Sequence, residues 1–135
     1  MREILFRGQT RRHGEKVRLD GDKVPGHWVY GGIFQGTGDY SVIYDINGKY
    51  AVYSDTVGQY TGLKDKYGER IFEGDILLLD GEDGYFKLEF DEDTARFVMI
   101  GDSVQVDFDN FWSYEVEVIG NIHDNPELLK EGAHE

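Results

Sequence analysis

The sequence has no cysteine among its 135 residues. This absence excludes disulfide bonds, thiolate nucleophiles and zinc or iron–sulfur sites built on cysteine. Only two residues are proline, and no apolar run approaches the roughly 20 residues that a membrane-spanning helix needs. Residues 1–7 are too few and too charged to act as a signal peptide. We therefore expect a soluble protein of the cytoplasm that makes no contact with a membrane.

Glycine and aromatic residues are abundant instead. There are 18 glycines, and aromatic residues make up 14% of the chain. Short runs of alternating polarity are separated by turn signals about every 8–12 residues, a spacing typical of all-β sandwiches and small barrels. The length suits one domain. Within residues 1–135 we distinguish an N-terminal portion, 1–56, from a barrel-like C-terminal portion, 57–129.

The clearest local pattern is a β-hairpin over residues 41–53. Two β-rich runs meet at Asn47-Gly48, a pair that favours a two-residue turn with positive φ at both positions. The preceding glycines Gly31-Gly32 are interpreted as part of a flexible connection, and the polar stretch 8–26 as an irregular loop. Further strands are predicted at residues 2–6, 27–30, 76–79, 85–90, 95–100, 104–108 and 116–119.

A short helix is predicted near the C-terminal end of the sequence. Asn125 suits the N-cap, Pro126 the first helical position and Glu127 the first turn. The predicted helix has about two turns.

Charge is distributed unevenly along the chain. The 27 acidic and 14 basic residues give a net charge of −13. Residues 73–109 contain 12 acidic and 2 basic residues, whereas residues 1–23 carry a net charge of +3. The summed negative field would repel nucleic acid, so direct binding to it is not expected. The ordinary interpretation of the other charges is that they are solvated on the surface.

No pattern of reactive residues indicates catalysis. The acidic turns at 82–83 and 91–93 lack the spacing of a calcium loop, and the four histidines form no zinc-binding pair. The glycine-rich segment 31–38 lacks the Gly-Lys-Ser/Thr ending of a phosphate loop, and no serine lies in a nucleophile elbow. The sequence therefore predicts no catalytic residue, no cofactor and no metal ligand.

Three segments together resemble the YopX family, which is typically encoded by bacteriophages and prophages. They are the opening segment 1–7, the long central segment Val57–Ile76 and the closing segment Glu117–Leu129. Residues 27–31 also match. The resemblance implies a single YopX-like domain, an all-β pseudo-barrel capped by a short C-terminal helix. It also implies a phage or prophage origin, a place in the bacterial host cytoplasm, and no established activity or catalytic residues.

Several functions remain open at this point. The leading hypothesis is a non-enzymatic phage accessory protein that binds a host or phage protein, or further copies of itself as a homo-oligomer. Alternatives are an acidic decoy that imitates DNA, a nucleic-acid binder that uses the basic arm at 2–23, and a metal-dependent hydrolase. The candidate interaction residues share exposed charge, polarity or an aromatic ring: Arg2, Arg7, Arg11, Arg12, Trp28, Gln59 and Lys64.

Overall fold

A computed structural model describes residues 3–10, 27–79, 81 and 84–132. The chain divides into two compact units, Met1–Gln59 and Tyr60–Glu135. Both are built from antiparallel strands, and a short helix follows the last strand, so the predicted all-β class with a C-terminal helix is confirmed. Among the described residues, no sheet closes into a barrel.

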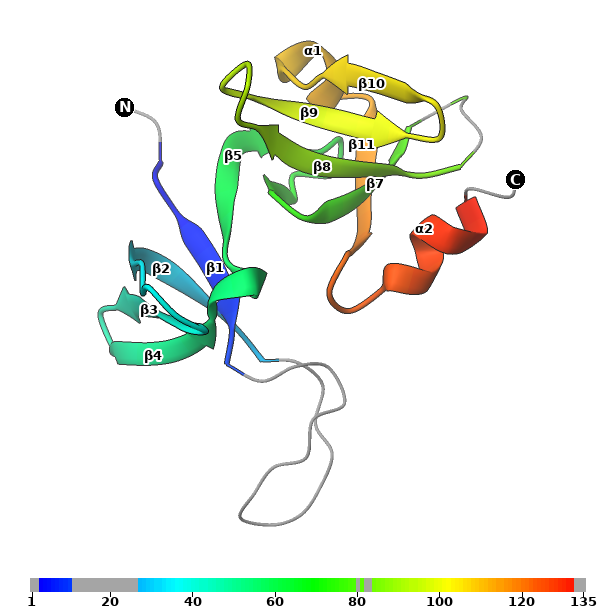
Figure 1. Cartoon of the computed structure of the whole chain (residues 1–135). Coiled ribbons are helices and arrows are strands. Elements are labelled where there is room, and N and C mark those ends of the chain that lie inside the picture. The colour runs from blue at the N-terminus through cyan, green and yellow to red at the C-terminus, as the bar shows by residue number, and fades with distance from the viewer. Residues whose placement is uncertain (1–2, 11–26, 80, 82–83, 133–135) are drawn as a thin grey trace. The chain divides into compact units, whose positions relative to one another are not determined.

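The first unit is an antiparallel sheet in which β1 pairs with β2 and with the start of β5 (Figure 1). Its strands lie side by side in the order β4-β3-β2-β1, and the start of β5 lies next to β1. Along the chain, the short 3₁₀ helix η1 stands between β4 and β5. The core is formed by Val29, Ile43 and Val52, which alternation places on one face of the sheet. The bounds are β1 Phe6–Gln9, β2 Trp28–Phe34, β3 Tyr40–Asp45, β4 Gly48–Tyr53, η1 Ser54–Thr56 and β5 Gly58–Lys64.

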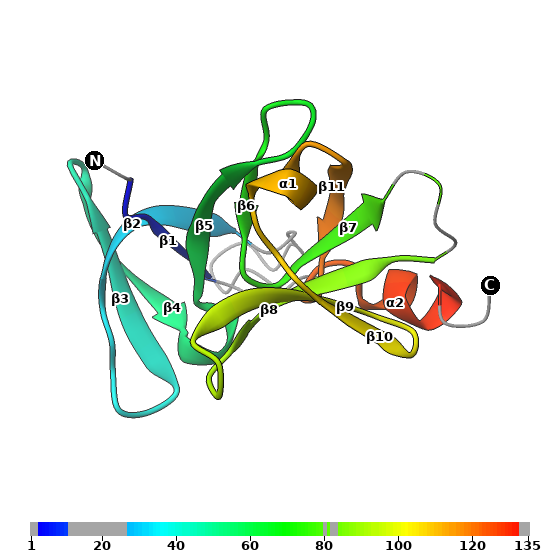
Figure 2. The same cartoon turned by 90° about the horizontal axis from the view of Figure 1, so that it is seen from above.

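The second unit contains the rest of β5, paired with β6, and a five-stranded sheet of order β10-β9-β8-β7-β11 (Figure 2). Its largest fully buried side chains include Ile71, Leu77, Leu88 and Met99. The bounds are β6 Arg70–Phe72, β7 Asp75–Leu79, β8 Phe86–Asp91, β9 Arg96–Gly101, β10 Val104–Asp107, α1 Asn110–Ser113, β11 Val116–Asn121 and α2 Pro126–Gly132. No helix in the described ranges is long and apolar enough to cross a bilayer.

The predicted hairpin is present, but its turn lies one residue earlier than expected. Asp45 pairs with Gly48, so the two-residue loop is Ile46-Asn47. Of the two expected turn residues only Gly48 has a positive φ, 156°, and the prediction of positive φ at both is wrong. The Asp45 carboxylate is the cause, because its Oδ1 accepts hydrogen bonds from the N–H groups of Asn47 (2.8 Å) and Gly48 (3.0 Å).

The predicted flexible connection at Gly31-Gly32 is also wrong, because both glycines lie inside β2. A Cβ at Gly31 would overlap the carbonyl oxygen of Tyr44, and one at Gly32 would come within 2.5 Å of the Tyr44 ring. These glycines are therefore required by the close approach of β2 and β3 rather than by a turn.

The first strand begins where it was expected to end. It runs from Phe6 to Gln9, and Gln9 is buried although it is polar. The Gln9 N–H donates to the Thr56 Oγ1 atom (2.9 Å), which explains how a polar segment is retained in the sheet. Residues 11–26 of the predicted irregular loop lie outside the described residues.

Most other predicted strands are confirmed, as is the helix that starts at Pro126. In β8 the alternating residues Phe86 and Leu88 are buried, but Phe90 on the same face is exposed. The short helix α1 was not predicted, since its four residues carry no periodic signal.

Candidate functional site

Alternate residues of β2, β3 and β4 form an outer surface that is mostly aromatic. Opposite the buried core residues of the first unit, the side chains of Phe34 (70% exposed), Tyr40 (56%), Tyr44 (48%) and Tyr30 (45%) face solvent. We call this surface the aromatic face, and its members are Tyr30, Phe34, Tyr40, Val42, Tyr44, Lys49, Ala51 and Tyr53.

The strand register arranges the aromatic face in rows that run across the strands. Tyr44 lies opposite Lys49, and Tyr40 opposite Tyr53 with ring centroids 5.1 Å apart. The row between these pairs consists of Phe34, Val42 and Ala51, which are successive partners on β2, β3 and β4.

A shallow cavity of about 430 Å³ opens on the aromatic face. It is lined by Phe34, Val42, Tyr44 and Lys49. Gly32 has no side chain, and the Tyr44 ring lies over that position. The cavity therefore offers apolar and aromatic contact beside a single cation, which suits an apolar group next to a carboxylate.

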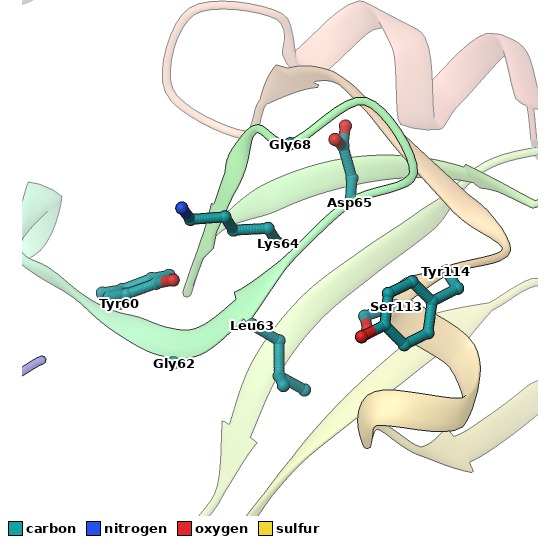
Figure 3. A pocket seen from close by; sticks show the side chains of 8 residues that line it. All are labelled: Tyr60, Gly62, Leu63, Lys64, Asp65, Gly68, Ser113 and Tyr114. Carbon is teal, nitrogen blue, oxygen red and sulfur yellow. The ribbon is translucent and has the colours of Figure 1, made fainter. Parts of the chain in front are cut away.

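A second hollow of about 380 Å³ lies in the second unit (Figure 3). Figure 3 shows Tyr60 and Lys64 from β5 on one side, and Ser113 and Tyr114 from the end of α1 on the other side of Leu63. The Arg70 guanidinium lies over the Tyr60 ring, 5.7 Å from its centroid. The lining residues are Tyr60, Gly62, Leu63, Lys64, Asp65, Gly68, Ser113 and Tyr114.

The polar groups of this second hollow stabilise the local backbone. The Oδ1 atom of buried Asp65 accepts from the N–H groups of Tyr67 and Glu69, and Oδ2 accepts from Val118 N–H, all at 2.9 Å. The Ser113 hydroxyl donates to the Asn110 carbonyl oxygen (3.2 Å). Asp65 and Ser113 therefore hold the loop and α1 in place, whereas Lys64 and Tyr114 are exposed lining side chains.

The sequence-predicted interaction residues are spread over both units. Arg7 is buried, with its guanidinium 4.6 Å from the ring centroid of half-buried Trp28. Gln59 is half-buried opposite Phe6, and Lys64 is exposed at the second hollow. The structure thus brings Arg7 and Trp28 together within the first unit, and Lys64 belongs to the second unit. Arg2, Arg11 and Arg12 lie outside the described residues.

Sequence reasoning missed the aromatic face. Both alternating sets of β3 contain apolar residues, so the pattern does not reveal which set is buried. The signal that was available is the density of tyrosine in the hairpin, at residues 40, 44, 50 and 53.

Several acidic residues of the segment 73–109 are occupied by local interactions. Asp75 is buried and accepts from the Phe72 N–H (2.7 Å), while Glu89 and Asp107 form 2.7 Å ion pairs with Lys87 and Arg96. In the part of the chain that the structure describes, no three ligating side chains gather in a way that would hold a metal ion.

Comparison with known proteins identifies the family. The family model described as YopX protein matches residues 14–130. The chain belongs to the YopX family. A crystal structure of protein EF1440 from Enterococcus faecalis is similar to this YopX chain, with 22% sequence identity, a TM-score of 0.52, and coverage of 96% of this chain and 99% of that one. This likeness shows the fold alone. No curated protein matches.

The central YopX segment, Val57–Ile76, forms β5, β6 and the start of β7. The sequence of this segment predicts core positions at Tyr60 and Ile71 and turns at its glycines. Tyr60 and Ile71 are buried, and Gly62, Gly68 and Gly74 have φ values of 89°, 84° and 92°. Gly58 is instead a buried residue of β5 without a positive φ, so a turn at this position is wrong. This YopX segment is accounted for largely by folding requirements.

Proposed function

We propose that this YopX protein is a non-enzymatic binding protein whose aromatic face contacts a partner protein. The observation that carries the proposal is the exposure of Phe34, Tyr40 and Tyr44 on neighbouring strands of one sheet face. Single exposed apolar side chains are common, but a contiguous set of this kind marks an interaction site.

The chemistry of the face suits a protein interface. Tyrosine offers a large, rigid apolar ring together with a hydroxyl that stays hydrated until a partner arrives. Aromatic residues are enriched at interfaces and dominate binding energies there. Four tyrosines and one phenylalanine in eight positions match that composition.

The charge distribution favours the first unit as the contact region. Residues 1–59 contain eight basic and seven acidic residues, whereas residues 60–135 contain six basic and twenty acidic ones. The net charges are therefore +1 and −14. A partner with an acidic contact surface meets little repulsion at the first unit and strong repulsion at the second.

The family supports a partner drawn from a bacterial host or a phage, since phage and prophage genomes typically encode YopX proteins. The acidic-decoy hypothesis rests on the charge distribution of the sequence, to which the aromatic face adds nothing. The nucleic-acid hypothesis adds stacking on aromatic rings such as Trp28 and Tyr30, but the net charge of −13 opposes it. Protein binding uses the aromatic face without this electrostatic cost.

A capture experiment with matched variants tests the proposal. Tagged protein is incubated with bacterial lysate with and without nuclease treatment, and each captured protein is then purified and titrated. Phe34→Ser and Tyr44→Ser should weaken its binding about tenfold or more, as expected for central aromatic anchors. Tyr114→Ser, which removes a similarly exposed ring from the second unit, is the control and should bind like the unmodified protein.

Two results would contradict the proposal. Capture that disappears on nuclease treatment would show that nucleic acid carries the interaction. An equal loss of binding in Phe34→Ser and in the control Tyr114→Ser would show that the loss is not specific to the aromatic face. Circular dichroism of each variant checks that the fold is retained.

A further inference from the structure

The strand β4 lies at an edge of its sheet. In the described part of the chain β3 is its one strand partner. An exposed edge presents backbone N–H and C=O groups that can pair with another strand. Natural edges are often protected by proline, bulges or several charges, but β4 reads Gly-Lys-Tyr-Ala-Val-Tyr, has a continuous register with β3 and contains one charge, at Lys49.

The hydrogen-bonding pattern identifies which backbone groups point outward. The Ser54 N–H donates to the Asp39 carbonyl oxygen (2.7 Å). Opposing pairs in an antiparallel ladder alternate between bonded and non-bonded. Counting back from Ser54, residues Val52 and Tyr50 bond to β3, and the N–H and C=O groups of Ala51 and Lys49 point away from it.

The outward groups are limited to a short stretch of the strand. The carbonyl oxygen of Tyr53, the next residue in this set, accepts a hydrogen bond from the Thr56 hydroxyl (2.6 Å). Lys49 and Ala51 are both exposed. Their two N–H and two C=O groups are enough to pair with one short extended segment.

The same two residues also point their side chains onto the aromatic face. Ala51 ends the row Phe34–Val42–Ala51 at the sheet edge, and its methyl group is the smallest side chain on that face. A side chain of an added strand opposite Ala51 can therefore extend over it toward Val42 and the cavity. Lys49 lies two residues away and faces the same side.

We infer that the edge of β4 binds an extended segment of a partner protein as an additional antiparallel strand. The segment places an apolar side chain opposite Ala51 and a carboxylate two residues later, opposite Lys49. Backbone hydrogen bonds supply affinity in such complexes, and the cavity and the cation supply specificity. The antiparallel direction continues the pairing of the existing sheet. This inference rests on the proposed function and adds the form of the partner.

Selection from a library tests the inference without knowledge of the natural partner. A display library of random peptides of about twelve residues, long enough to span the edge, is selected on the full chain alone, and each selected peptide is then titrated against Ala51→Pro. Proline removes the outward N–H of Ala51 and leaves the bonds between β3 and β4 intact, because proline is tolerated where the N–H of an edge strand faces solvent.

The selected peptides should show the pattern apolar–any–acidic. Ala51→Pro should bind them about tenfold more weakly or worse, the loss expected when a backbone hydrogen bond is removed from an interface. Lys49→Glu should reverse the preference from an acidic to a basic residue at the third position. On the unmodified protein, binding should slow hydrogen exchange at the Ala51 and Lys49 amides.

A peptide methylated at the backbone nitrogen opposite Ala51 provides a second measurement that does not depend on folding of a variant. It should also bind about tenfold more weakly. Strand addition is overturned if the selected peptides bind Ala51→Pro as tightly as the unmodified protein and the methylated peptide binds as tightly as the unmethylated one. If the binding of those peptides is nevertheless lost in Phe34→Ser, the proposed function stands. If Phe34→Ser still binds them, the proposed function and the inference both fail.

A second copy of this chain is the alternative occupant of the edge. Light scattering of the unmodified protein and of Ala51→Pro distinguishes it. An oligomer that becomes a monomer in Ala51→Pro, with no peptide enriched, assigns the edge to self-pairing and overturns the inference. Failure to enrich any peptide on a monomeric protein overturns it as well.

Discussion

At the scale of single residues, the lack of space beside β2 restricts position 31 to glycine. Gly31 lies where any Cβ would overlap the Tyr44 carbonyl oxygen, and the obstacle is backbone, which cannot rotate away. Gly38 has no atom within 4 Å of its Cβ position and no positive φ. The two glycines therefore form a natural pair of sites for comparison.

We expect Gly31→Ala to lower the free energy of unfolding by about 2 kcal/mol or more, because overpacking forces the strands apart. Gly38→Ala should change it by less than about 0.5 kcal/mol, as for an unobstructed surface site. Urea unfolding of both variants measures the difference. Equal unfolding midpoints for the two variants would contradict the close approach of β2 and β3.

The Asp45 carboxylate determines the turn of the hairpin. Asp45→Ala removes the acceptor of two exposed backbone N–H groups, and we expect a loss of about 1 kcal/mol in unfolding free energy. Asp45→Asn keeps an acceptor oxygen and should recover most of this loss. Chemical denaturation measures both changes. An unaffected Asp45→Ala would mean that the Asn47-Gly48 sequence specifies the turn without the carboxylate.

At the scale of secondary-structure elements, Asp65 joins the loop between β5 and β6 to β11. Its two oxygens accept three backbone N–H groups, one of them from Val118, 53 residues away. This side chain thus provides a connection that the sheet pairing alone does not. Its burial makes the unpaired N–H groups costly if the carboxylate is removed.

We expect Asp65→Ala to destabilise the second unit by about 3 kcal/mol or more. Asp65→Asn should cost less, since one oxygen can still accept from Tyr67 and Glu69 while the amide nitrogen cannot accept from Val118. Thermal unfolding ranks the variants. Asp93→Asn, at an exposed turn, is the control and should be neutral. If Asp65→Ala and Asp93→Asn have the same midpoint, the proposed connection is absent.

The elements that the sequence predicted well are those with strong local signals. The strand around Ile76–Leu79 has a continuous apolar run, and the helix at Pro126 has a defined start. Where prediction failed, the deciding contact was remote or polar. The Tyr44 carbonyl oxygen leaves no space for a Cβ at Gly31, and Thr56 accepts a hydrogen bond from the backbone of Gln9 in β1. The Asp45 carboxylate accepts from the backbone of the turn, which lies one residue earlier than predicted.

The candidate site was harder to predict than the fold. Local alternation identifies two faces of β3 but not which one packs on the core, because that depends on strands β1 and β2. Apart from Trp28, the candidate residues chosen from the sequence were charged or polar, whereas the surface that the structure exposes is aromatic.

At the scale of the whole molecule, the two units differ in charge by fifteen elementary charges, +1 against −14. Self-repulsion among like charges destabilises a compact state, and salt screens it. Each unit contains one tryptophan, Trp28 in the first and Trp112 in the second. Variants with a single tryptophan therefore report on each unit separately.

We expect added salt to stabilise the second unit more than the first. Between about 50 mM and 500 mM NaCl the Debye length falls from about 14 Å to about 4 Å. The melting transition seen by Trp112 in Trp28→Phe should rise with salt, while that seen by Trp28 in Trp112→Phe should change little. Equal shifts at both tryptophans would show that the charge difference does not act on the units separately.

The strand β5 belongs to both units, because its first residues pair with β1 and its last pair with β6. Phe6 can pair with Gln59 only after that residue, more than fifty positions later in the chain, has been synthesised. At a synthesis rate of roughly 5–20 residues per second, β1 has only β2 and its neighbours for several seconds. The ribosome therefore has to reach the very end of the first unit, at the start of β5, before the sheet of that unit is complete, and a pause or premature stop near residue 57 would leave β1 as an open edge of the nascent chain.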